Sequence, residues 1–134
     1  MPLLKIVDKG ARSTLPFSPA IVAGEFVYVS GQASVDREDG HIIEGSFEEE
    51  MRRSIENLAV ILEAEGLTLD HVINVKCYLG SQDYRDEHNR IYPEYFTDPL
   101  PTRSTISGVL GTSLKYELDA VAYAPLRRQE AQRA

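Results

Sequence analysis

The sequence predicts an α+β fold, in which a mixed sheet carries two helices on one of its faces. Two segments have apolar residues at helical spacing, and four have strand-like composition or alternation. Along the chain the order is roughly β-β-α-β-α-β-β, which is typical of an α+β domain. A length of 134 residues suits a single domain with a substantial core.

The predicted strands are recognised by composition and by turn signals. Residues 24–32 are rich in β-branched and aromatic side chains, and the Asp39-Gly40 pair that follows is a turn signal, so we expect the chain to double back there. Residues 71–80 alternate between apolar and polar side chains. Residues 101–107 and 115–123 are predicted as the last two strands.

Two helices are predicted between these strands. Ser46 and Glu49 match a capping box, an apolar stripe follows at helical spacing, and Gly66 is suited to end the helix. The second helix is predicted within residues 81–96. Pro93 removes a helical hydrogen bond, so we expect a kink or an early end there.

Composition restricts the function classes. The net charge of −7 argues against broad nucleic-acid binding, and no apolar run has the length of a membrane span. The start of the chain does not have the pattern of a signal peptide, and Cys77 has no second cysteine with which to form an intrachain disulfide. We therefore expect a cytoplasmic protein that uses no metal, with one domain over residues 1–126 and a solvated tail over 127–134.

Two helices can cover only one face of the predicted sheet. The other face carries apolar and small residues, which favours burial against further copies of the chain. The sequence thus predicts a closed oligomer.

Arg103 is a permanent cation inside a segment that otherwise resembles a buried strand. It could pair with a carboxylate or lie along the surface, as arginines near strand ends commonly do. It could instead anchor the carboxylate of a small organic acid, because guanidinium offers two parallel N–H donors. Asp119 is the candidate catalytic partner, and Glu117 projects from the same strand face, so either carboxylate could lie nearer the site.

Six segments together resemble the RidA/YjgF family of enamine/imine deaminases. They are "YVSGQASVD", "SIENLAVILEAEG", "HVINVKCYL", "HNRIYPEYF", "PTRSTISGVLG" and "YELDAVAY", in the family's order and spacing. The resemblance implies a chorismate-mutase-like fold and a homotrimer whose three sheets form a central barrel. It also implies active sites in clefts between subunits.

The resemblance assigns site residues one by one. Arg103 matches the family arginine that binds the substrate carboxylate, and the backbone N–H of Thr105 assists it. The remaining substrate-binding positions implied by the resemblance are Ser30, Gly31, Phe17, Asn89 and Tyr92. Two positions depart from the family pattern. Phe17 lacks the hydroxyl of the usual tyrosine, and Asp119 is one methylene shorter than the usual glutamate, so the water-activating end matches only in part.

The implied reaction is hydrolysis of small 2-imino or enamino acids, such as 2-aminoacrylate and 2-iminopropionate, to 2-keto acids and ammonia. No metal or organic cofactor is expected, since the imine is already electrophilic and needs a held water and a route for a proton. The alternatives are the same scaffold acting on a divergent substrate, and a binder of small carboxylates without turnover. The implied partners are the small imino or keto acid and further copies of the chain, with neither a membrane nor a nucleic acid.

Overall fold

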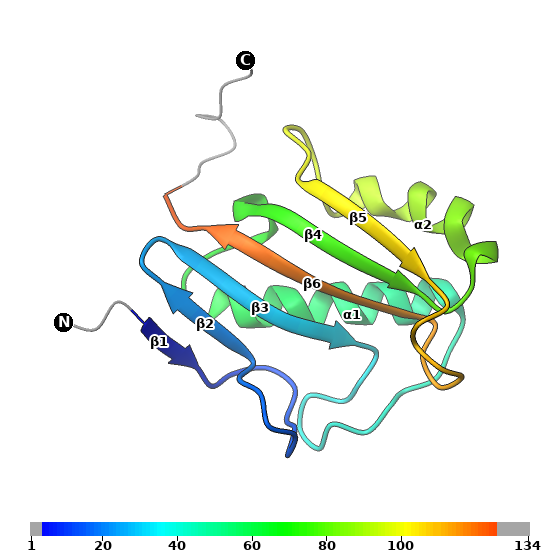
Figure 1. Ribbon diagram of the computed structural model, residues 1–134, viewed down its shortest axis with the longest axis horizontal. Helices are drawn as coiled ribbons and strands as arrows, with labels where there is room; N and C mark the ends of the chain where they lie inside the picture. Colours follow the sequence, from blue (N-terminus) through cyan, green and yellow to red (C-terminus); the bar gives the residue numbers. More distant parts are fainter. Residues whose placement is uncertain (1–3, 126–134) are drawn as a thin grey trace.

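The computed structural model describes residues 4–125 and shows one six-stranded mixed sheet with its helices on one face (Figure 1). The strands are β1 (Leu4–Val7), β2 (Ala20–Ala23), β3 (Phe26–Ala33), β4 (Val72–Leu79), β5 (Thr102–Ser107) and β6 (Tyr116–Tyr123). They lie in the order β1-β2-β3-β6-β4-β5, and β4 and β5 run parallel while all other neighbours are antiparallel. The predicted α+β class is therefore confirmed.

The long helix α1 (Phe47–Glu63) begins and ends as the sequence predicts. The Ser46 hydroxyl accepts a hydrogen bond from the Glu49 backbone, and the Glu49 carboxylate accepts one from the Ser46 backbone. Past its other end, Gly66 adopts a φ of 73°, a left-handed conformation that suits glycine. The apolar stripe packs under β3 and β6, and Met51 and Ile55 are fully buried.

The second helical region consists of three short pieces. They are η2 (Gln82–Tyr84), α2 (Arg85–Ile91) and η3 (Tyr92–Glu94), while a further single turn, η1 (Leu69–His71), precedes β4. Pro93 lies within η3, so the early end expected at this proline is confirmed.

The N-terminal part of the sheet differs from the prediction. The reversal at Asp39-Gly40 exists, since the Gly40 N–H donates to the Asp36 carbonyl, but it forms only the isolated bridge between Val35 and Ile42. The strand that pairs with β3 instead comes before it, as β2, and β1 adds an edge strand that the sequence did not reveal. A four-residue strand is too short for alternation to identify it.

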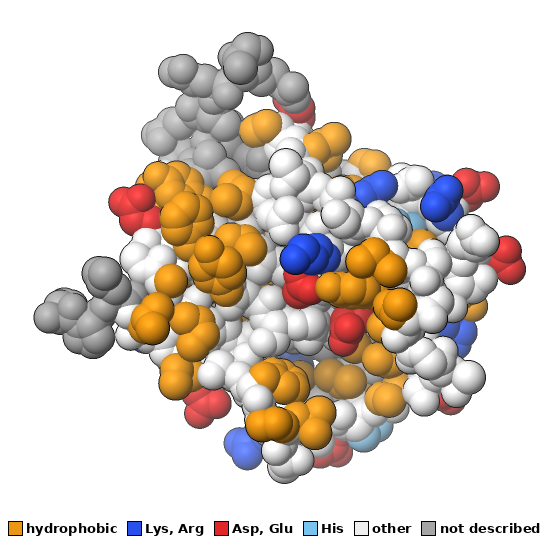
Figure 2. All heavy atoms as spheres, viewed as in Figure 1, with side chains coloured by type: hydrophobic (Ala, Val, Ile, Leu, Met, Phe, Trp, Pro, Cys, Tyr) orange, Lys and Arg blue, Asp and Glu red, His pale blue; other side chains and the backbone are white. Residues whose placement is uncertain are grey.

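The face of the sheet opposite α1 is not covered within the chain. Phe26, Tyr28 and Ile106 are exposed on it, and Figure 2 shows apolar side chains gathered over β2 and β3 on this face. In the described part of the chain, no helix is long and apolar enough to span a bilayer. The tail predicted at 127–134 lies outside the described residues.

Candidate active site

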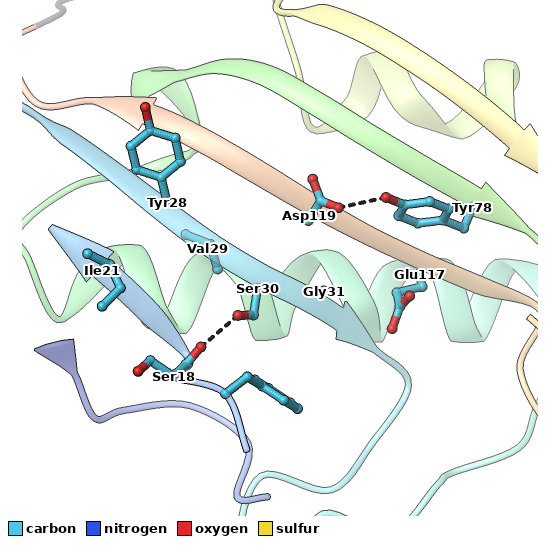
Figure 3. A pocket seen from close by; sticks show the side chains of 10 residues that line it. Ser18, Ile21, Tyr28, Val29, Ser30, Gly31, Tyr78, Glu117 and Asp119 are labelled. Atoms are coloured by element: carbon cyan, nitrogen blue, oxygen red, sulfur yellow. Dashed lines mark hydrogen bonds between the residues drawn. The ribbon is translucent and has the colours of Figure 1, made fainter. Parts of the chain in front are cut away.

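A hollow of about 600 Å³ opens on the uncovered face of the sheet (Figure 3). Strands β2, β3, β4 and β6 and the segment before β2 contribute its walls. The lining residues are Phe17, Ser18, Ile21, Tyr28, Val29, Ser30, Gly31, Tyr78, Glu117 and Asp119. Its size and its mixture of apolar and carboxylate groups suit a small polar molecule.

An irregularity in β3 shapes one wall of this hollow. The pairing of β3 with β6 shifts between Val29 and Gln32, as in a β-bulge, and such bulges re-aim side chains beside active sites. The Ser30 hydroxyl donates to the Ser18 carbonyl over 2.6 Å, which ties β3 to the segment before β2. At Gly31, an added Cβ would lie 3.0 Å from the Glu117 carboxyl carbon, so the missing side chain gives Glu117 its place.

Two carboxylates from β6 form the polar end of the hollow. Glu117 and Asp119 are two residues apart and share one face of the strand. Asp119 accepts a hydrogen bond of 2.8 Å from the Tyr78 hydroxyl. Burial, and secondarily the negative charge of Asp119, raises the pKa of Glu117, while the hydrogen bond to Asp119 raises the pKa of Tyr78 to about 12.

Arg103 belongs to a second group of residues, beside the edge strand β5. Its Nη2 donates to Asn89 Oδ1 over 2.9 Å, and its guanidinium lies 4.8 Å from the centre of the Tyr92 ring. It forms no ion pair with any described residue. A cation that is held by an amide and an aromatic ring keeps donors for an incoming anion.

A buried layer supports this arginine from the helix side. His88 and Tyr116 are fully buried, with His88 Nε2 lying 3.4 Å from the Tyr116 hydroxyl, which in turn donates to Cys77 Sγ. Burial, and then the nearby charge of Arg103, lowers the pKa of His88 to about 4. Burial raises the pKa of Cys77 to about 11, as expected for an inert core thiol.

Arg103 and Asp119 lie on opposite faces of the sheet in a single chain. In the register, Arg103 lies beside Val75 and Asp119 lies opposite Lys76. Val75 is buried under the helices and Lys76 is exposed on the other face, as consecutive residues of a strand must be. The two strands are also not neighbours, since β4 lies between them.

The residues singled out in the sequence therefore form two sets. The hollow brings together Phe17, Ser30, Gly31 and Asp119, and the Arg103 set contains Asn89 and Tyr92, with Thr105 two residues along the same strand. Tyr78 was missed as a site residue, although the alternation of residues 71–80 separates it from the apolar face of the predicted strand. Its reach to Asp119 depends on strand pairing, which the sequence does not display.

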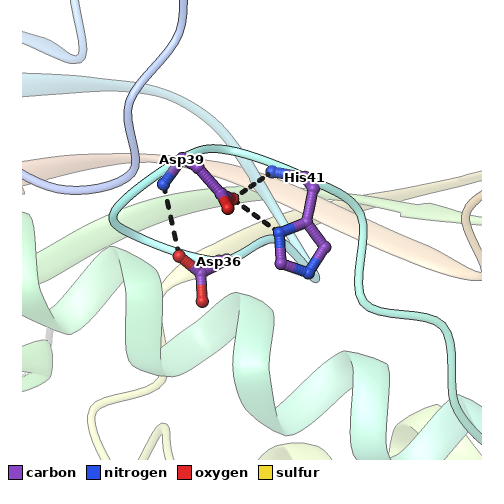
Figure 4. Close-up of side chains that lie close together, drawn as sticks. All are labelled: Asp36, Asp39 and His41. Atoms are coloured by element: carbon purple, nitrogen blue, oxygen red, sulfur yellow. Dashed lines mark hydrogen bonds and ion pairs between the residues drawn. The ribbon is translucent and has the colours of Figure 1, made fainter.

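One other group of ligand-type side chains occurs among residues 4–125. Potential ligand atoms of Asp36, Asp39 and His41 lie within 4.8 Å of one another on the loop after β3 (Figure 4). Asp36 accepts hydrogen bonds from the backbone of Glu38 and Asp39, and Asp39 accepts them from the backbone and ring of His41. The bonds from the backbone and then the ring of His41 lower the pKa of Asp39, and the whole set is that of a tight turn.

Comparison with known proteins agrees with this architecture. The family described as endoribonuclease L-PSP matches residues 9–124. A RutC family protein of Pyrococcus abyssi is 35% identical over 117 residues, which span 87% of this chain and 92% of the relative. The human 2-iminobutanoate/2-iminopropanoate deaminase is 29% identical over 108 residues, 80% of this chain and 79% of the human protein.

A solved structure is similar over nearly its full length. YyfA of Yersinia pestis, a protein of the Rid family, superimposes with a TM-score of 0.81 at 25% identity, covering 90% of this chain and 98% of that one. The chain belongs to the endoribonuclease L-PSP family, that is, the RidA/YjgF family.

Proposed function

We propose that the protein hydrolyses small 2-imino acids, such as 2-iminopropionate and its enamine tautomer 2-aminoacrylate, to 2-keto acids and ammonia. The proposed sites lie between adjacent chains of a homotrimer. Each site combines Arg103 of one chain with the hollow of the next.

The observation that carries this proposal is the separation of the two sets of residues. Arg103 has unused donors at one edge of the sheet, and the carboxylates line a hollow on the opposite face. Neither set can bind a small acid and hydrolyse it alone. A closed ring of chains with a heterologous interface presents the edge of one chain to the face of its neighbour, which also covers the apolar residues of that face.

In the proposed reaction, Arg103 holds the substrate carboxylate by a two-pronged contact. Water adds its oxygen to C2 of the imine and loses one proton, while the imine nitrogen gains one. The carbinolamine then loses ammonia as its C–N bond breaks and its hydroxyl becomes the keto group. The overall balance is imino acid plus water to keto acid plus ammonia, so no oxidant or cofactor takes part.

The two carboxylates suit different parts of this sequence. Asp119 accepts the Tyr78 hydrogen bond and can orient the water. Burial raises the pKa of Glu117, so that this carboxyl can donate a proton to the departing nitrogen. Asp119 is therefore the proposed water-positioning residue, and Glu117 is the proposed proton donor.

Four further features support the proposal. The human relative carries the name of an imine deaminase. The net charge of −7 disfavours an RNA backbone as substrate, and the single buried cysteine suits the cytoplasm. Phe17, which is half-exposed and lines the hollow, offers an apolar contact for a substrate side chain.

The test generates 2-aminoacrylate in situ with a serine dehydratase and measures pyruvate and ammonia above the spontaneous rate. We expect acceleration by the wild-type protein and by Arg90→Ala, an exposed control on the same helix as Asn89. Imines made by an amino-acid oxidase from several amino acids then define the range of side chains. No acceleration with any imine, together with carboxylate binding that depends on Arg103, would identify a binder in place of an enzyme.

A further inference from the structure

Tyr78 of β4 lies beside both carboxylates of the hollow, which belong to the neighbouring strand β6. In the β4–β6 register its Cα lies opposite Glu117, yet its hydroxyl donates to Asp119 Oδ2 over 2.8 Å. The tyrosine therefore crosses the strand pair diagonally, which long aromatic side chains can do. Figure 3 shows its ring directed along the sheet toward Asp119, while the Tyr28 hydroxyl points away from that carboxylate.

The other ionisable groups that the same chain places near the pair do not replace this contact. Strand β4 places Lys76 opposite Asp119 in the register, but no ion pair joins them among the described residues. Strand β3 contributes Tyr28, and Cys77 is buried on the other face. Within residues 4–125, the Tyr78 hydroxyl is thus the one side-chain donor to Asp119.

This contact bears on which carboxyl holds a proton. A hydroxyl that donates to a carboxylate stabilises the ionised form, and two carboxylates that share a small site resist being ionised together. Glu117 lies against the backbone at Gly31, with the charge of Asp119 beside it. The two carboxyl groups share one face of β6, but their surroundings therefore differ.

We propose that Tyr78 is a positioning residue, which fixes the Asp119 carboxylate beside Glu117, so that Asp119 positions the water and Glu117 carries the transferable proton. Tyr78 acts through Asp119 and need not touch the substrate. The catalytic meaning of this division rests on the proposed deaminase function, whereas the division itself is a property of the folded protein.

The direct test is a pH titration of the Glu117 side-chain carboxyl by NMR, in the wild type and in three variants. In Asp119→Asn, loss of the neighbouring charge is expected to lower the Glu117 midpoint. In Tyr78→Phe the midpoint is expected to move in the same direction, because the Asp119 carboxylate is then no longer held beside Glu117. In the double variant, adding Tyr78→Phe to Asp119→Asn is expected to cause little further shift, since Tyr78 acts through Asp119.

The matched control is Tyr123→Phe, which removes the same kind of tyrosine–carboxylate hydrogen bond, to Glu25, on an exposed part of the same strand as Asp119. It should leave the Glu117 midpoint unchanged. An unchanged Glu117 midpoint in Tyr78→Phe, or shifts that simply add in the double variant, would overturn the proposal.

An activity measurement separates this inference from the proposed function. If the Glu117 proton is used, kcat/KM falls as pH rises through the Glu117 midpoint, and this alkaline limb moves to lower pH in Tyr78→Phe. If the alkaline limb stays in place while the NMR midpoint moves, Glu117 is not the proton donor of the reaction, but the positioning role of Tyr78 is still supported. If the wild type has no deaminase activity but the variants show the expected shifts of the Glu117 midpoint, the proposed function alone is contradicted.

Discussion

The Arg103 edge and the carboxylate hollow are opposite in charge and in construction. The edge presents one cation over an aromatic ring, supported by the buried His88–Tyr116–Cys77 layer. The hollow presents two carboxylates on a face that the chain itself leaves uncovered. Opposite charges on neighbouring strands can form an ion pair when they share one face of a sheet. Here the sheet separates them, so both remain available for a substrate and for a neighbouring chain.

The largest expected effect comes from removing the cation. Arg103→Ala should lower kcat/KM for imine hydrolysis on the order of 10²- to 10³-fold, because the substrate carboxylate loses its charged partner. Arg103→Lys should also be impaired, since lysine offers no two-pronged contact. Steady-state kinetics beside Arg90→Ala provide the measurement. Full activity in Arg103→Ala would contradict an anchoring role.

Mixing variants tests whether the two regions meet between chains. Arg103→Ala and Glu117→Gln homo-oligomers should each be nearly inactive. After the two are unfolded and refolded together at equal amounts, about a quarter of the sites should combine an intact Arg103 with an intact Glu117, if chains assemble at random in a closed ring. Recovery to roughly that fraction of wild-type activity is expected, and no recovery would place both residues in one chain's site.

A smaller effect is expected at the wall of the hollow. Gly31→Ala would bring a Cβ within 3.0 Å of the Glu117 carboxyl carbon, so that side chain must move by a few tenths of an ångström. We expect kcat/KM to fall about tenfold while stability changes little, because the proton donor is displaced. Thermal unfolding beside the kinetics distinguishes displacement from misfolding, and an unchanged kcat/KM would show that the position of Glu117 is not critical.

The buried layer under Arg103 predicts a pH dependence of stability. The folded protein keeps His88 neutral down to about pH 4, whereas the unfolded chain protonates it near 6.5. The contribution of neutral His88 to the free energy of unfolding is therefore complete above pH 6.5. It is lost as pH falls from about 6.5 to about 4, by at most about 1.4 kcal/mol per pH unit.

Denaturant unfolding between pH 4 and 7 measures this slope. His88→Gln should flatten it relative to the wild type. Equal slopes in both proteins would mean that His88 takes up its proton at its ordinary pKa in the folded state.

Local signals in the sequence were sufficient for most of the fold. The Ser46–Glu49 capping box, the stripe of α1, Gly66 and Pro93 each act within a few residues, and all four are found where the sequence predicts them. Strand β1 and the upstream partner of β3 were missed, because pairing between short strands leaves no periodic pattern.

The candidate site depended more on tertiary structure. Residue types and family motifs identified Arg103, Asn89, Tyr92, Ser30, Gly31, Phe17 and Asp119. Their division between two faces of the sheet follows from the strand order β6-β4-β5 and from the register of Val75 with Arg103. The diagonal contact of Tyr78 with Asp119 follows from the register of β4 with β6.

The amino-acid sequence by itself determined most of the elements, the family and the chemical groups available, because capping, periodicity and motifs are local properties of the chain. Only the tertiary structure decided that the cation and the carboxylates face away from each other. Side-chain direction alternates along every strand, so the face that a residue occupies is defined only once the sheet is assembled and the helices have covered one side.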